Sequence, residues 1–374
     1  GAQFSVAAGL VESLDSVFRE VLDLRERYRE DPLVEVWLAP SALWGLDQDG
    51  LRETRKLADR ENLGLTMHMW ETPTDEQVAR ERFGEDSALD VYRRTGFLEG
   101  QLLAVHGVCL GEKEMAGMEE HGTCLSHNPA SNMILGSGTA PVPALTRRGV
   151  TVALGTDGAA SGNTVSMLEA MKLATLLHKV SGRDPLALTA RKAVEMATLE
   201  GARALGLEDS TGSLEAGKSA DFFLADPGNH LTGCPVWDPW ASLVYALDSS
   251  CVDTVVIAGR TVLRDGKFDG NREEEALRDL KKEVRRLAGL LHLPGPGAAD
   301  VPRLAQGLGG ELPGVGDDTG QNLDEGHVFL GDGAVVGYPD PEDEGGAPPS
   351  LGRGGGDPDG AALDQFVQVP PGSV

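Results

Sequence analysis

Short apolar runs alternate with helical patterns through the first half of the chain, and this alternation constrains the fold most. The runs cover residues 34–40, 64–68, 102–107, 122–127 and 150–157. Helical patterns lie near 50–61, 87–97, 111–121 and 141–149, and two longer ones follow near 163–180 and 186–205. Such alternation is typical of a parallel sheet, either doubly wound or closed into a barrel. The pattern predicts five strand–helix units, whereas a closed (β/α)₈ barrel needs eight.

The flanking segments have a different character. Residues 10–30 predict an amphipathic helix with one apolar stripe, formed by Leu10, Leu14, Val17, Phe18, Val21 and Tyr28. Residues 207–270 contain short strands with turn signals, and 252–268 predict a β-hairpin around an Ala-Gly-Arg turn. A charged helix is expected over 271–293. Residues 294–374 are rich in Gly, Pro and Asp, a composition typical of disorder. These changes of character divide an α/β part over 1–206 from a β-rich part over 207–270. The family resemblance described below implies a partial barrel for the first and part of a small β-sandwich for the second.

Net charge and cysteine usage limit the classes of binding partner and the cellular compartment that we expect. The formal net charge is −26, so the surface repels nucleic acids and anionic membranes. No apolar run reaches the roughly 18 residues that a membrane-spanning helix requires. The four cysteines are scattered without a CxxC pair, which favours a reducing cytoplasm over a disulfide framework.

Polar residues stand where the predicted strands end. They are His68, His106, His127 and Asp157, and Glu71 follows the first of them by three positions. Each alone is weak evidence, because a lone histidine beside a turn is usually structural and an Asp can simply cap a helix. On successive parallel strands, however, they would meet at the carboxyl edge of the sheet, where barrel enzymes place their active sites. The set therefore predicts an active site at that edge.

The residue types suit a metal-assisted hydrolysis. Imidazole nitrogen with carboxylate oxygen is a donor set for Zn²⁺, or for Fe²⁺. A metal with an open position lowers the pKa of a bound water from about 16 towards about 7. Glu71 could then take the proton of that water and return it to a leaving amine. His106 could polarise the group under attack.

Residues 34–268 resemble the amidohydrolase superfamily, in the branch of S-adenosylhomocysteine/methylthioadenosine deaminases and triazine hydrolases. The motifs that carry the resemblance appear in family order: HMWET (68–72), AVHGVCL (104–110), SHNPASNM (126–133) and LGTDGAASGN (154–163). The segments TGSLEAGKSADFFLAD and VIAGRTVLRDGKF look like the family's composite β-sandwich. The resemblance implies an α/β fold, a metal-dependent (β/α)₈ barrel with a small β-sandwich.

The resemblance also implies roles for the strand-end residues. His68 and Asp157 match the metal ligands, and Asp157 also orients the attacking hydroxide. Glu71 matches the proton shuttle. His106 matches the histidine that binds and polarises the substrate. We therefore expect Glu71, His106 and Asp157 to be catalytic.

Further residues are expected around this centre. His127, Asn128 and Asn132 belong to the SHNPASNM loop, which buttresses the site in the family. We place Trp44 and Trp70, together with the catalytic histidine, among the residues that contact substrate.

The sequence departs from the family pattern in two ways. The family begins its barrel with a His-x-His that supplies two further metal ligands, and none of the eight histidines here lies two residues from another. We therefore expect a fragment without strands one to three of the barrel. Many adenosine-type deaminases also carry a histidine after the Pro that ends strand four, where this chain has Ser41 after Pro40. This leaves adenosine-like and triazine-like substrates both open.

The tail carries a weaker resemblance. Residues 326–339 and the ending LDQFVQVPPGSV are similar to the family's N-terminal strands, cut just before the metal-binding histidines. The alternative is a chance match in a low-complexity segment. We expect the genome to encode an Asn-x-His-x-His segment that adjoins this sequence, either upstream of Gly1 or directly after Val374.

The sequence thus predicts a hydrolytic deaminase of a small nitrogen heterocycle, a cyclic amidine, that forms a homo-oligomer when full length. The alternative is an inactive remnant without the His-x-His ligands. We expect residues 1–374 alone to bind zinc weakly and to lack turnover. If the chain supplies substitute ligands, His127 and His121 are the first to test.

Overall fold

The computed structural model describes residues 12–228, 230–268, 270 and 272–290. Leu10 of the predicted amphipathic stripe and the whole tail over 294–374, with its segment 326–374, lie outside the described residues. All described residues belong to the compact unit Gly1–Gly333. Among them no helix is long and apolar enough to cross a membrane.

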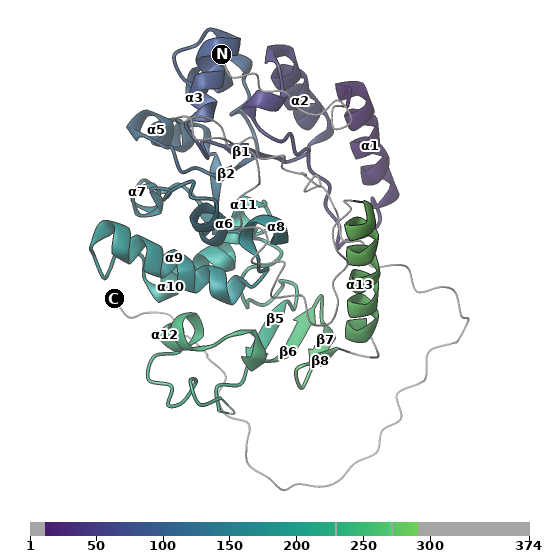
Figure 1. Cartoon of the computed structure of the whole chain (residues 1–374), viewed down its shortest axis with the longest axis vertical. Helices are drawn as coiled ribbons and strands as arrows, with labels where there is room; N and C mark the ends of the chain where they lie inside the picture. The colour runs from purple at the N-terminus through teal and green to yellow at the C-terminus, as the bar shows by residue number, and fades with distance from the viewer. Residues whose placement is uncertain (1–11, 229, 269, 271, 291–374) are drawn as a thin grey trace, which may run out of the picture. The chain divides into compact units, whose positions relative to one another are not determined.

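The first part of the chain forms a parallel sheet in the order β1-β2-β3-β4. Its strands are β1 (Leu65–Met69), β2 (Leu102–His106), β3 (Cys124–His127) and β4 (Val152–Leu154). Leu65 pairs with Leu102, and His127 pairs with Leu154, so the four carboxyl ends lie at one edge. Helices α2 (Gln48–Glu61), α4 (Ala88–Thr95), α5 (Glu112–His121) and α7 (Val142–Arg147) connect the strands or precede them, as predicted (Figure 1).

The predicted first strand over 34–40 is wrong. This segment touches the sheet only through two isolated parallel bridges, between Leu38 and Leu65 and between Ala42 and His68. Pro40 lies between them, and proline cannot donate to a strand ladder. The described residues therefore contain four parallel strands and a bridged edge segment instead of five strands.

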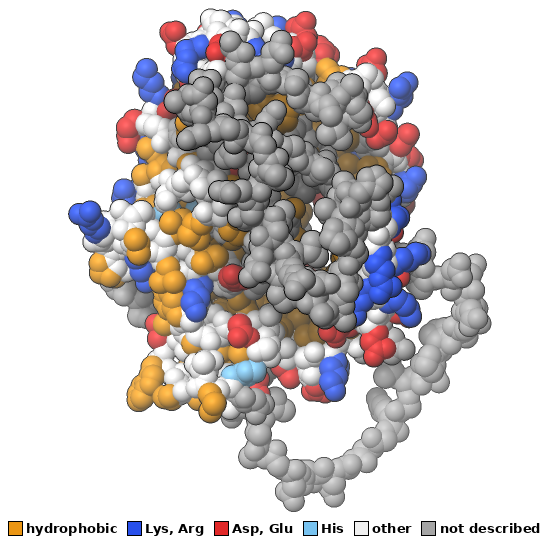
Figure 2. Space-filling view, in the orientation of Figure 1, with side chains coloured by type: hydrophobic (Ala, Val, Ile, Leu, Met, Phe, Trp, Pro, Cys, Tyr) orange, Lys and Arg blue, Asp and Glu red, His pale blue; other side chains and the backbone are white. Residues whose placement is uncertain are grey.

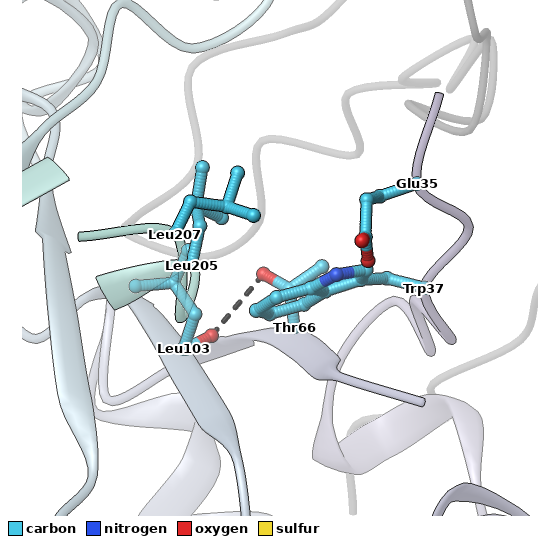
Figure 3. A pocket seen from close by; sticks show the side chains of 6 residues that line it. All are labelled: Glu35, Trp37, Thr66, Leu103, Leu205 and Leu207. Atoms are coloured by element: carbon cyan, nitrogen blue, oxygen red, sulfur yellow. Dashed lines mark hydrogen bonds between the residues drawn. The ribbon is translucent and has the colours of Figure 1, made fainter. Parts of the chain in front are cut away.

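Alternate residues of the strands face opposite sides of the sheet. Leu65, Met67 and Met69 of β1 are at most 1% exposed and join the main hydrophobic core. Thr66 and Leu103 face the other side and line a pocket of about 290 Å³. In Figure 3 Leu103 lies on the same side as Leu205 and Leu207, and Thr66 lies across from them beside Trp37, with Glu35 beyond.

The helices after β4 differ from the prediction at one point. Helix α9 (Met167–Gly182) forms, but the predicted helix over 186–205 divides into α10 (Ala190–Ala197) and α11 (Leu199–Ala204). The break is Thr198, whose φ of −129° and ψ of −94° are not helical. Its hydroxyl donates to the carbonyl of Val194, which competes with the regular backbone ladder.

A separate antiparallel sheet follows, in the order β5-β6-β7-β8. Its strands are β5 (Phe222–Ala225), β6 (Val252–Ile257), β7 (Arg260–Arg264) and β8 (Lys267–Phe268). The predicted hairpin is confirmed, because Ile257 pairs with Arg260 across Ala258 and Gly259. Both turn residues have positive φ, +48° and +75°, as a type I′ turn requires.

The remaining elements are short or peripheral. Helix α1 (Leu14–Arg27) packs Phe18, Val21 and Leu22 against the core, and α13 (Arg272–Leu290) is the predicted charged helix. The others are η2 (Leu43–Gly45), α3 (Thr74–Val78), η3 (Ala79–Phe83), α6 (Pro129–Ile134), α8 (Ala159–Gly162), α12 (Pro239–Ala241), η4 (Ser242–Ala246) and η5 (Ser249–Cys251).

Candidate active site

Strained backbone marks the carboxyl ends of three strands. Trp70 follows β1, His106 ends β2 and Asp157 follows β4, and their φ angles are +54°, +77° and +59°. Left-handed backbone in non-glycine residues costs about 1–3 kcal/mol and is found where the surroundings impose it, often at functional sites. The sequence motifs around these residues therefore coincide with left-handed backbone that the surrounding structure must impose.

Backbone hydrogen bonds between neighbouring turns hold this geometry. The amide of Gly107 donates to the carbonyl of Met69 over 3.1 Å, and the amide of Cys109 donates to the carbonyl of Trp70 over 2.7 Å. Gly107 has a φ of +58°, and a Cβ there would lie 2.5 Å from a methyl of Leu125. Only glycine fits this close approach between the turn and β3.

The turns bring four polar side chains together. Nε2 of His106 lies 3.8 Å from Oε2 of Glu71 and 3.9 Å from Oδ2 of Asp157. The rings of His68 and His106 stack with their centroids 5.3 Å apart. Residues up to 89 positions apart in sequence thus form one cluster at the edge of the sheet.

Each of the two clustered histidines has one ring nitrogen fixed by a hydrogen bond. Nδ1 of His68 lies 2.7 Å from the carbonyl oxygen of Ser41, which can only accept, so this nitrogen carries the proton. Nδ1 of His106 donates to Oδ1 of Asn132 over 2.8 Å. In the neutral rings both Nε2 atoms keep a lone pair. A histidine that donates Nδ1–H to a carbonyl and offers Nε2 is the usual arrangement of a metal ligand.

The two carboxylates also have defined partners. Ser137 donates its hydroxyl to Oε1 of Glu71 over 2.9 Å. The amide of Gly158 donates to Oδ1 of Asp157 over 2.6 Å. Each carboxylate therefore keeps its second oxygen directed towards His106. The side chain of Glu71 is 25% exposed and that of Asp157 is 9% exposed, so the cluster is open to a small molecule at the glutamate.

The donor set fits part of a divalent metal site. Nε2 of His68 and Oδ2 of Asp157 are borderline-hard donors of the kind that zinc and iron(II) accept. Among the described residues, however, no group of three or more His, Cys, Asp and Glu side chains could hold a metal ion by itself. His121, considered as a substitute ligand, lies at the end of α5 with its Nδ1 3.4 Å from Glu99. His121 pairs with carboxylates there and does not join the cluster.

His127, the other substitute considered, is occupied in a buried pair. Its Nε2 lies 3.2 Å from Nε2 of His178 on α9, and its side chain is 0% exposed. Burial, then the neighbouring rings of His178 and His106, lower the pKa of His127 to about 3. Burial lowers the pKa of His178 to about 4. Both rings are neutral at pH 7, and one must donate to the other.

The SHNPASNM loop packs beneath the cluster. Asn132 is 0% exposed and Asn128 is 2% exposed. Asn128 accepts from the hydroxyl of Ser126 over 3.2 Å, and a Cβ on Gly155 would lie 2.1 Å from its Oδ1. The loop is thus locked against the turn that presents Asp157.

The two tryptophans that were expected to contact substrate lie in surroundings different from each other. The indole of Trp70 is 0% exposed and packs edge-on against Tyr92, with ring centroids 5.3 Å apart. This burial does not favour a contact between Trp70 and substrate. Trp44 is half-buried against the core, and its carbonyl accepts from Arg82.

Three residues of the site region were not found by sequence reasoning. They are Asp75, Ser137 and His178. Ser137 lies 66 residues from its partner Glu71, and His178 lies 51 residues from His127, so no local spacing links them. Asp75 stands in the segment after HMWET, but only its burial distinguishes it from the neighbouring acidic residues.

A parallel α/β sheet with His, Glu, His and Asp gathered at its carboxyl edge defines the metal-dependent hydrolase class of barrel. The sequence matches the Amidohydrolase family over residues 3–262. The chain belongs to this family, which confirms the resemblance drawn from its motifs.

Two curated relatives show how far the match extends. The chain is 38% identical over 269 residues to 5-methylthioadenosine/S-adenosylhomocysteine deaminase 1 of Syntrophus aciditrophicus, covering 72% of this chain and 60% of the relative. It is 36% identical over 299 residues to 5′-deoxyadenosine deaminase of Methanosarcina mazei, covering 77% and 67%. The chain therefore spans about 60% of the length of the first of these relatives.

Solved structures agree with this assignment. An adenosine deaminase from Xanthomonas campestris with bound zinc superposes with a TM-score of 0.70 at 33% identity, covering 74% of this chain and 63% of that one. An atrazine chlorohydrolase from Arthrobacter aurescens complexed with zinc gives 0.69 at 24% identity, covering 73% and 61%. The second likeness shows the fold alone.

Proposed function

We propose that this chain carries the proton-transfer and substrate-polarising half of a metal-dependent deaminase that hydrolyses the exocyclic amine of an adenosine-like heterocycle. The observation that supports this most is the convergence of Glu71 and Asp157 on Nε2 of His106, within 3.9 Å. Relatives named as deaminases of adenosine derivatives are 35–38% identical, whereas the triazine enzyme is 24% identical. The adenosine-like class is therefore preferred, despite Ser41 after Pro40.

His68 and Asp157 would hold a divalent metal, zinc or iron(II), together with ligands outside the described residues. When bound, the metal lowers the pKa of a coordinated water, so that hydroxide is available near neutral pH. Glu71 takes the proton of the nucleophile on Oε2 while Ser137 fixes Oε1. The same carboxyl then returns the proton to the departing amine, which leaves as ammonia.

His106 acts on the other partner of the reaction. Its Nε2 faces the space between the two carboxylates, and Asn132 fixes its Nδ1. Because Nδ1 already donates to Asn132, His106 donates from Nε2 only as the imidazolium, and in that form it donates to a ring nitrogen of the heterocycle and stabilises the charge that develops during attack. The partner in this reaction is a small heterocyclic substrate.

The proposal also includes an assembly of copies of the full-length enzyme. Exposed apolar side chains on α6 and α9 support assembly, because apolar surface of this kind is often covered by a partner. They are Ile134, Leu176 and Val180, each more than 40% exposed, and apolar atoms gather over this part of Figure 2.

The test is ammonia release from a substrate panel. The purified full-length enzyme, supplied with Zn²⁺ or Fe²⁺, is offered adenosine, 5′-deoxyadenosine, methylthioadenosine, S-adenosylhomocysteine and a chlorotriazine. Glu71→Gln should lower kcat by roughly 10²–10⁴-fold without changing metal content, because Glu71 is not a ligand. Glu81→Gln, the same change at an exposed residue outside the cluster, should leave kcat unchanged.

The second candidate function is a non-catalytic remnant. It is favoured by the lack, among the described residues, of any group of three metal-binding side chains. A folded full-length enzyme that releases no ammonia from any substrate with either metal would support this candidate. Near-normal turnover by Glu71→Gln would instead refute the assignment of the proton carrier.

A further inference from the structure

Asp75 is a buried carboxylate that the proposed chemistry does not use. It lies in α3, four residues after Glu71, and it is 6% exposed. Its Oδ2 accepts the backbone N–H of Trp70 over 2.5 Å. This is the only hydrogen bond that the side chain of Asp75 makes among the described residues.

The burial of this carboxyl is unfavourable for its charge. The pKa of Asp75 is raised to about 7, mainly by desolvation. The Trp70 N–H and His68 lower it, and the charges of Glu76 and Glu71 raise it. A buried carboxyl without a salt-bridge partner depends on its hydrogen bonds to offset the cost of its desolvation. The partner of that hydrogen bond therefore indicates its role.

That partner is one of the strained residues. Trp70 has a φ of +54°, a conformation that bulky residues rarely adopt. Three contacts hold it there: Asp75 accepts its N–H, Cys109 donates to its carbonyl over 2.7 Å, and its indole packs edge-on against Tyr92. Of these, the contact with Asp75 is the only one that satisfies the Trp70 N–H.

The direction of the next residue depends on this turn. Glu71 follows Trp70 directly, so rotation about the Trp70 backbone would swing its carboxylate away from His106 and from Ser137. Proton transfer requires the carboxylate within hydrogen-bond reach of its target, and a misplacement of about 1 Å can cost roughly 10²-fold in rate.

We propose that Asp75 is a positioning residue for Glu71: by accepting the N–H of Trp70 it holds the left-handed turn that directs the Glu71 carboxylate at His106. This inference rests on the proposed function of Glu71 as the proton carrier. Asp75 does not touch substrate or metal in this role, and its acceptor oxygen matters more than its charge.

The first measurement is hydrogen exchange at the Trp70 amide in the full chain. Selective ¹⁵N-tryptophan labelling gives five backbone amides, and Trp70→Phe assigns the signal. Asp75→Ala should speed exchange at Trp70 by about tenfold or more, the equivalent of one lost hydrogen bond. Asp75→Asn keeps an acceptor oxygen and should preserve protection, and Asp86→Ala is the matched change at an exposed aspartate.

The second measurement is the position of Glu71. In a crystal structure of Asp75→Ala, the Glu71 carboxylate should have lost its contact with the Ser137 hydroxyl and moved away from His106. In the assay for ammonia release, kcat should fall roughly 10- to 100-fold with KM within about threefold, and Asp75→Asn should restore most of it. A purely structural role would lower stability without this separation of kcat from KM.

Several results would overturn the inference. Trp70 protection unchanged in Asp75→Ala, or Glu71 in place in its crystal structure, would do so. If Asp75→Ala does not fold, the unmodified chain still decides, because a Trp70 amide that exchanges as fast as that of the 90% exposed Trp237 is not held by Asp75. Failure of the proposed function is distinct: the full-length enzyme would then lack turnover, or its Glu71→Gln variant would retain it, while exchange and crystal structure of the chain still report on Asp75.

Discussion

Acidification should destabilise the fold through the buried pair of His127 and His178. Their pKa values in the folded chain are about 3 and about 4, against an ordinary value of 6.5. The unfolded chain therefore binds protons at higher pH than the folded chain does. The contribution of this pair to the free energy of unfolding is fully present above pH 6.5. It is lost as pH falls from 6.5 towards the folded-state pKa values.

The magnitude follows from the size of these shifts. Each histidine contributes a slope of about 1.4 kcal/mol per pH unit between its unfolded and folded pKa values. At pH 5 each has cost roughly 2 kcal/mol relative to pH 8, or about 4 kcal/mol together. Asp75 acts in the opposite direction, since its folded pKa of about 7 lies above its ordinary 3.8. Its protonation on acidification returns roughly 2.6 kcal/mol, which leaves a net loss of about 1.4 kcal/mol.

Urea unfolding at pH 8 and pH 5 separates these contributions. His178→Gln should remove one of the two destabilising titrations, so its loss between the two pH values should be about 2 kcal/mol smaller than that of the unmodified chain. Asp75→Asn removes the opposing titration, so its loss should be about 2.6 kcal/mol larger. The reasoning is refuted if all three proteins lose the same free energy of unfolding, because the buried groups would then not control the pH dependence.

Other changes test the site directly. Asp157→Ala should lower metal content and kcat together, measured by metal analysis and ammonia release, and a variant with full metal and rate would show that Asp157 is only a turn residue. Ser137→Ala should lower kcat by roughly tenfold while metal content stays constant, because the Glu71 carboxylate loses one partner; an unchanged kcat would argue against that contact. Gly155→Ala should lower the thermal midpoint, since its Cβ would lie 2.1 Å from Oδ1 of Asn128, and an unchanged midpoint would show that the loop yields.

The sequence predicted the site in parts. The motifs placed His68, Glu71, His106 and Asp157 at strand ends, and parallel pairing brings strand ends to one edge. It could not predict Ser137 as the partner of Glu71, because hydrogen bonds between residues distant in sequence depend on loop conformation. The prediction of a strand over 34–40 was wrong for a related reason. An apolar run does not indicate whether a hydrogen-bonded strand ladder forms around Pro40.

By itself, the sequence determined the alternation of strands and helices, the hairpin around Ala258 and Gly259, and the residue types of the site. These properties depend on side-chain periodicity and on local backbone preferences, which are written in short windows of sequence. Only the tertiary structure decided that Trp70 is left-handed and buried, that Asp75 holds its amide, and that His127 faces His178. These features arise because packing of distant segments removes water from polar groups, and each buried group then takes the partner that the fold provides.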